Sequence, residues 1–176
     1  YAEAHNNLGA ALKDMGRLEE AISHYRAALA LKPDYPEAHH NLGSALQRQN
    51  RVAEAAASYR QALALKPNYP EVCNSLGNLL QQQGSLTDAV MLHQQAIALK
   101  PNFAEAHHSL ANALLQQKNI EQAIAHYHQA LGLRPNYPEA FNNLGNALQE
   151  QGKSEEAIAQ YRCAIELRPD FAEAYS

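Results

Sequence analysis

The sequence predicts an all-helical solenoid built from pairs of antiparallel helices. The chain of 176 residues repeats itself every 34 residues with no insertion or deletion, which is typical of a helical array. Within each unit, apolar residues recur twice with helical spacing. A glycine or asparagine separates the two helical patterns, and a proline follows the second, so each unit holds two helices and two breaks.

Five complete units follow one another, and a sixth begins at the end of the sequence. Because a single unit of this length buries too little surface to fold alone, its stability must come from stacking on its neighbours. We therefore expect one continuous array over residues 1–176. The repeats are predicted at 2–35, 36–69, 70–103, 104–137 and 138–171, with a sixth starting at 172–176.

The first helix of each unit is predicted to end in a left-handed turn. Ala38, Leu42 and Leu46 mark one apolar face of this helix in the second unit. Glycine ends it in three units, at Gly16, Gly84 and Gly152, and Asn50 tolerates the same conformation in the second. In the fourth unit the glycine is missing, and we expect Asn119 to supply the positive φ there.

The second helix is predicted to pack a small residue against the first and to end at a cation and a proline. Gly43 and Ala62 are expected where the two helix backbones approach closely. Lys66-Pro67 and its equivalents place a positive charge at the negative end of the helix dipole. Asp34, with Glu37 three residues later, has the spacing of a capping box that starts the next unit.

Composition excludes several classes of partner. The net charge is −4 and opposite charges are interspersed, so neither nucleic acid nor an anionic membrane surface is expected as a partner. No apolar run is long enough for membrane insertion. The two cysteines occupy different phases of the repeat, which disfavours a disulfide and favours a reducing, cytoplasmic location.

The sequence indicates no enzyme, cofactor site or metal site. It holds no glycine-rich phosphate loop and no inserted domain that would enclose a reactive residue. Adjacent histidines such as His107-His108 point about 100° apart on a helix, so they cannot share one ion. No two histidines within a first helix are four residues apart.

These positions together resemble the tetratricopeptide repeat (TPR) family. The residues that carry the resemblance recur with a 34-residue period. They are Leu-Gly in the first helix, alanine and tyrosine four residues apart in the second, a further alanine, and the closing proline. The resemblance implies a right-handed superhelix whose concave wall is made by the first helices. It also implies that extended peptide or protein segments lie in that concave groove.

Polar first-helix residues opposite the leucine face are the candidate groove residues. Amides both donate and accept hydrogen bonds, so regularly spaced asparagines can pair with the backbone of an extended peptide whatever its sequence. The alternative is that residues such as Asn41 and Asn143 only satisfy backbone groups between helices. The candidates are Asn6, Asn7, His40, Asn41, Ser44, Gln47, Asn74, Asn78, His108, Asn112, Asn142, Asn143 and Asn146.

The leading hypothesis is a non-catalytic scaffold that binds extended protein segments. Asparagine before Leu-Gly, as in Asn7-Leu8-Gly9, is also similar to the asparagine-lined superhelix of the protein O-GlcNAc transferases. That resemblance implies an alternative, the substrate-recruiting domain of a larger glycosyltransferase. A third hypothesis is a structural scaffold that assembles with itself.

Self-association is expected either through the ends of the array or through one apolar pair. Met91 and Leu92 stand where other repeats have small or polar residues, on the face of the second helix away from its alanine stripe. An exposed apolar pair favours a partner. The alternative is that Met91 and Leu92 are isolated exposed apolar residues, which are common on protein surfaces.

Overall fold

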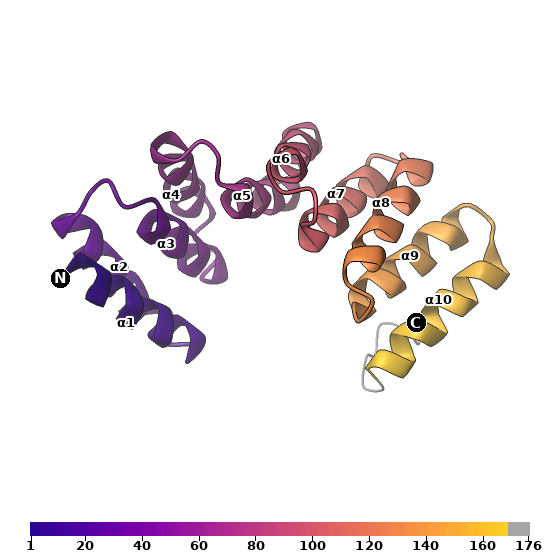
Figure 1. Cartoon of the computed structure of the whole chain (residues 1–176), viewed down its shortest axis with the longest axis horizontal. Helices are drawn as coiled ribbons and strands as arrows, with labels where there is room; N and C mark the ends of the chain where they lie inside the picture. Colours follow the sequence, from indigo (N-terminus) through magenta and orange to yellow (C-terminus); the bar gives the residue numbers. More distant parts are fainter. Residues whose placement is uncertain (169–176) are drawn as a thin grey trace. The chain divides into compact units, whose positions relative to one another are not determined.

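The computed structural model describes residues 1–168, and this part of the chain is helical, with no strand (Figure 1). Successive helices are joined by short turns, as the period predicts, which confirms the all-helical fold. The helices are α1 (Ala2–Asp14), α2 (Leu18–Leu31), α3 (Pro36–Arg48), α4 (Val52–Leu65), α5 (Pro70–Gln82), α6 (Leu86–Leu99), α7 (Ala104–Gln116), α8 (Ile120–Leu133), α9 (Pro138–Glu150) and α10 (Ser154–Leu167).

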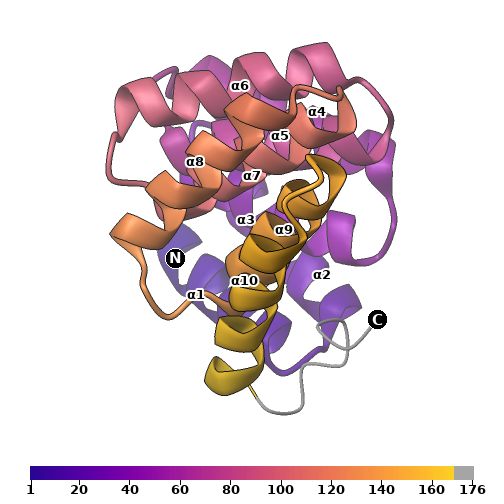
Figure 2. The same ribbon diagram turned by 90° about the vertical axis from the view of Figure 1, so that its right-hand side faces the viewer.

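The helices pack as consecutive pairs within two compact units, Tyr1–Leu79 and Leu80–Ser176. In the first unit α1 packs against α2, α2 against α3, and α3 against α4. In the second unit each helix from α6 to α10 packs against the next, and α9 and α10 lie side by side in both Figure 1 and Figure 2. A helix therefore buries its apolar face partly on its own repeat and partly on the next.

A tyrosine from the second helix lies at the centre of each well-packed repeat. Tyr25, Tyr59 and Tyr127 are among the largest side chains that are fully buried. In the second unit Tyr127 belongs to a buried cluster that draws on four consecutive helices, which is how neighbouring repeats stabilise one another. The cluster is Leu110, Ala111, Leu114, Ala123, Tyr127, Leu144, Ala147, Leu148 and Ala157.

Gly43 makes room for an aromatic ring, and the predicted close approach of the helix backbones at Gly43 and Ala62 stays a prediction. A Cβ atom placed on Gly43 would lie 2.7 Å from the Tyr59 ring, and one on Gly9 would lie 2.7 Å from Tyr25. The Gly145 position is equally close to Tyr161, at 2.5 Å. In these three repeats the glycine leaves the space beside the first helix in which the flat ring lies.

The left-handed turn is at the same repeat position throughout. Gly16, Gly84, Gly152 and Asn50 have positive φ, as predicted, but in the fourth repeat the residue is Lys118 with φ 65°, and Asn119 has φ −86°. The prediction for Asn119 is wrong because the packed helices on either side fix where the chain must turn. Lys118 therefore adopts the strained left-handed conformation, and the turn does not shift by one residue.

Replacing Lys118 by glycine is expected to stabilise the protein more than replacing it by alanine. Glycine removes the strain of the left-handed conformation, which costs about 1–2 kcal/mol, and loses part of the gain to its larger unfolded-state entropy. Both variants remove the exposed ion pair of Lys118 with Glu150, so their difference isolates the backbone. Urea denaturation should give K118G a free energy of unfolding about 1 kcal/mol higher than that of K118A. Equal free energies of unfolding would contradict backbone strain at Lys118.

The predicted capping box is also wrong. α3 begins at Pro36 with Tyr35 as its N-cap, and no side chain caps it, so Asp34 lies before the helix. Glu37 instead pairs with Lys66 at 3.3 Å, and the Lys66 ammonium lies 4.3 Å from the centre of the Tyr69 ring. The cation that ends the second helix is thus held between a carboxylate and an aromatic ring, a contact that the spacing of the acid alone did not reveal.

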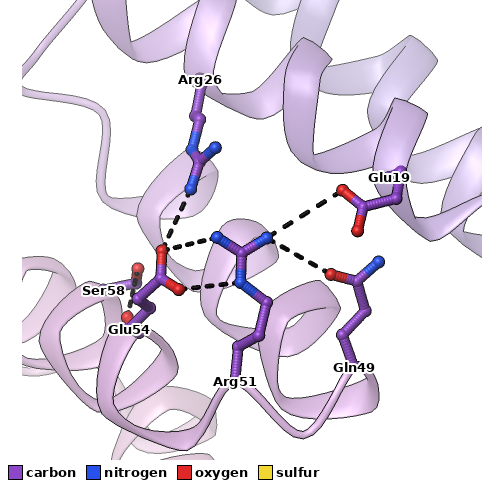
Figure 3. A network of polar contacts seen from close by, with 6 residues as sticks. All are labelled: Glu19, Arg26, Gln49, Arg51, Glu54 and Ser58. Atoms are coloured by element: carbon purple, nitrogen blue, oxygen red, sulfur yellow. Dashed lines mark hydrogen bonds and ion pairs between the residues drawn. The ribbon is translucent and has the colours of Figure 1, made fainter.

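An ion-pair network joins the first two repeats on the surface of their second helices (Figure 3). Glu54 of α4 accepts two hydrogen bonds from Arg51 at 2.8 Å and one from Arg26 of α2 at 3.1 Å. The hydrogen bond from Arg51 lowers the pKa of the Glu54 carboxyl. Because these groups are exposed to solvent, the network contributes little to stability.

Candidate functional site

The structure separates the predicted first-helix residues by burial. Asn6, Asn74 and Asn142 are buried, so they lie inside the packed helices. Asn7 and Asn146 are exposed. The others are half-buried, which leaves part of each side chain accessible from solvent: His40, Asn41, Ser44, Gln47, Asn78, His108, Asn112 and Asn143.

In the fourth and fifth repeats, internal hydrogen bonds fix the orientation of two amides. Tyr127 of α8 donates its hydroxyl hydrogen to Asn112 Oδ1 of α7 at 2.6 Å. Asn143 Nδ2 of α9 donates to the same oxygen at 3.0 Å. Both acceptor positions of the Asn112 oxygen are therefore used, and among the described residues no hydrogen bond engages Asn112 Nδ2 or Asn143 Oδ1.

His108 completes this arrangement in its neutral form. Its Nε2 lies 3.0 Å from Asn143 Nδ2, which can only donate, so Nε2 is the acceptor. Its Nδ1 then carries the hydrogen and donates to the Tyr137 hydroxyl oxygen at 3.1 Å. Burial lowers the pKa of His108 to about 4, so the ring stays uncharged at neutral pH.

These amides line a shallow hollow of about 310 Å³ on the second unit, here called the amide hollow. Two of its lining residues keep a polar atom without an internal hydrogen bond, the donor Asn112 Nδ2 and the acceptor Asn143 Oδ1, and a donor with an acceptor complements a peptide group. No charged residue lines it, so it carries no preference for a charged ligand. Its lining residues are Gln81, Asn112, Leu115, Gln116, Tyr127 and Asn143.

The first unit repeats parts of this network with different residues. Asn41 Nδ2 donates to Asn6 Oδ1 at 3.0 Å, and the Tyr59 hydroxyl donates to Gln47 Oε1 at 2.8 Å. The Tyr25 hydroxyl has no hydrogen-bond partner among residues 1–168, because Ala10 stands where Asn112 stands in the fourth repeat. The amide network is therefore a property of particular repeats.

The bridging alternative holds in part. Asn41 and Asn143 do connect neighbouring repeats, but they bond side chains of the preceding repeat, where the alternative expected backbone groups. Bridging and ligand contact are compatible, since a bridging amide that donates through its nitrogen still presents its oxygen. Binding by these residues stays a prediction.

Two pairs of histidines meet across neighbouring helices, which the spacing of histidines within a single helix does not reveal. His5 of α1 meets His24 of α2, and His107 of α7 meets His126 of α8. Both pairs are 19 residues apart and occupy the same repeat positions. That recurrence is the signal that would have found them.

The predicted apolar pair is only partly exposed. Met91 of α6 has 63% of its surface accessible, whereas Leu92 is half-buried. Together with Asp88 and Gln95 they line an open hollow of about 380 Å³. Self-association through this pair stays a prediction.

The described structure thus defines a class of protein, a solenoid of antiparallel helix pairs. Within residues 1–168, none of the helices has the length and apolar character needed to cross a membrane. The TPR repeat profile matches residues 11–50, 48–84, 77–118 and 111–152, and a tetratricopeptide repeat profile matches 138–171. The chain belongs to the tetratricopeptide repeat family.

Solved structures agree with this assignment of fold. The pilF protein of Pseudomonas aeruginosa superposes with a TM-score of 0.90 at 24% identity, over 98% of this chain and 79% of that one. A thermophilic TPR protein of Thermus thermophilus gives 0.81 at 25% identity, over 99% and 95%. YrrB, described as a TPR protein with an unusual peptide-binding site, gives 0.76 at 23% identity, over 99% and 90%. No protein with a curated description matches the chain.

Proposed function

We propose that this protein is a non-catalytic interaction scaffold that binds extended peptide segments through the amides of its first helices. The observation that carries the proposal is the fixed orientation of Asn112 and Asn143 in the amide hollow. Each amide uses one end to hold the repeats together and leaves the other end for a ligand. The peptide-binding site described for YrrB supports the same kind of use.

The uncharged lining predicts recognition of the peptide main chain with low sequence selectivity. A backbone carbonyl can accept from Asn112 Nδ2 while a backbone N–H donates to Asn143 Oδ1. Leu115 adds apolar contact that does not depend on the exact side chain of the ligand. We infer that many unrelated segments bind with similar affinity.

Replacing both Asn112 and Asn143 by alanine is expected to weaken peptide binding by roughly five- to 150-fold. Each good hydrogen bond to a ligand contributes about 0.5–1.5 kcal/mol, so losing two costs about 1–3 kcal/mol. Peptides for the measurement are selected by panning a random 12-residue display library against the chain. Their affinities are then measured by isothermal titration calorimetry.

The controls separate lost binding from lost folding. Asn136→Ala removes an exposed asparagine in a turn of the same unit and should leave affinity unchanged. Because Asn112→Ala leaves the Tyr127 hydroxyl without its partner, the double variant is also tested with Tyr127→Phe, and helical circular dichroism must stay intact. Unchanged affinity in the folded double variant, or a library that yields no binder, would overturn the proposal.

A further inference from the structure

The face of α6 that carries Met91 and Leu92 differs from the same face of the other second helices. Met91 has 63% of its surface exposed, and Leu92 is half-buried. The other four repeats have serine or alanine at the Met91 position, and histidine, serine or glutamine at the Leu92 position. A repeat can therefore be built without this apolar pair, so the fold alone does not account for the exposed Met91 side chain.

The hollow on this face has the outline of a helix-packing site. Its volume is about 380 Å³, and its lining residues are spaced i, i+3, i+4 and i+7 along α6: Asp88, Met91, Leu92 and Gln95. When two helices pack, four side chains with this spacing surround the hole into which a side chain of the facing helix inserts. The hollow is therefore shaped to receive a side chain from another helix.

The lining of the hollow is complementary to itself about a two-fold axis. When two copies of α6 pack antiparallel with the axis between Met91 and Leu92, this apolar pair meets the same pair of the second copy. Asp88 then faces Gln95 of the second copy, because the two residues are equally far from the axis along the helix. A carboxylate accepts and an amide donates, so each copy contributes both halves of a hydrogen bond.

The two polar residues are available for this contact. Both Asp88 and Gln95 are exposed. Among residues 1–168, neither side chain takes part in a hydrogen bond or an ion pair. A partner that supplies an apolar pair, a donor and an acceptor in this order along a helix is present in the chain itself.

We propose that α6 is a homodimer contact, in which two copies of the chain pack antiparallel through this face. The face is made of Asp88, Met91, Leu92 and Gln95. None of these residues lines the amide hollow, so the inference does not depend on the proposed function. A two-fold contact uses the same surface on both copies, so assembly stops at the dimer.

The test is sedimentation velocity of the full chain at increasing concentration. A stable interface buries roughly 1,200–2,000 Å², which exceeds what one helix face provides, so we expect a weak dimer with a dissociation constant of about 10⁻⁴ M. The chain should therefore sediment as a monomer at about 10 μM and mostly as a dimer at about 1 mM, with no larger species.

Removing the apolar pair should dissociate the dimer. Met91→Ser combined with Leu92→Gln is expected to raise the dissociation constant about tenfold or more. The variant should fold, because Ser23 and Gln160 occupy these positions in other repeats. Met15→Ser is the matched control, since Met15 is 69% exposed but lies outside this face, and it should leave the dissociation constant unchanged. Circular dichroism checks that each variant is helical.

A charge exchange tests the antiparallel register. Gln95→Asp places two carboxylates opposite each other at both ends of the contact and should weaken the dimer. Adding Asp88→Lys should restore it, because the new ammonium faces the carboxylate at position 95 of the second copy. The two positions lie two turns apart on one helix, about 10 Å, so restoration arises between copies. The proposal is overturned if the chain stays monomeric at the highest concentration, if the serine–glutamine variant dimerises as the wild type does, or if the exchange restores nothing.

Discussion

Acidification from pH 7 to pH 4 is expected to lower the free energy of unfolding by about 3 kcal/mol for each of His93 and His108. Burial lowers the pKa of both rings from 6.5 to about 4 in the folded protein. Between these pH values the unfolded chain binds more protons than the folded one. The stability that the two uncharged rings contribute is therefore fully present above pH 6.5 and is lost as the pH falls toward 4. His40 adds to the effect, since burial lowers its pKa as well.

The chain itself supplies the substitutions that test this. Tyrosine occupies the position of His93 in the other four repeats, and asparagine occupies the position of His108 in the first, third and fifth. The variant with His93→Tyr and His108→Asn should therefore fold and should lose much less stability than the wild type over the same pH range. Carboxylates titrate equally in both, so parallel pH profiles in urea denaturation would contradict the assignment.

Gly43→Ala is expected to destabilise the protein by about 1–3 kcal/mol, because the added methyl group overlaps the Tyr59 ring. The fully buried Tyr59 has little freedom to retreat. In the fourth repeat the same position is Ala111, beside Tyr127 in the buried cluster, so a repeat can be built with the methyl group when its surroundings are adjusted to it. In the second repeat a single substitution makes no such adjustment.

Gly132→Ala is the matched control. Gly132 lies in α8 with no atom near its missing Cβ, so alanine there should stabilise the protein by up to about 1 kcal/mol through helix propensity. Urea denaturation of both variants should therefore show changes of opposite sign. A stabilising or neutral Gly43→Ala would mean that the tyrosine does not need the glycine.

The fold could be predicted from the sequence because its information is local and repeated. Gly84 and Pro67 recur at fixed positions, so the ends of most helices follow from one unit. The errors occurred where packing overrides local preference. Lys118 takes the positive φ against its own preference, and Glu37 serves a cation near the end of α4 instead of a cap.

The candidate site was predicted less completely. Helical spacing indicated that Asn112 and Asn143 share a side of the first helices, but it does not say which end of each amide is already used. That depends on Tyr127, which comes from another helix, and on the tautomer of His108. The histidine pairs could not be predicted for the same reason, because the two histidines of each pair lie on different helices and meet only when those helices pack.

Recognition of the peptide main chain is tested most directly by comparing a selected peptide with two derivatives of it. One derivative has the same composition in scrambled order, and the other has the original order with every second backbone nitrogen methylated. Calorimetry should show the scrambled peptide binding the chain within a few-fold of the parent, and the methylated peptide binding at least tenfold more weakly. Tight binding of the methylated peptide together with loss of the scrambled one would contradict main-chain recognition by Asn112 and Asn143.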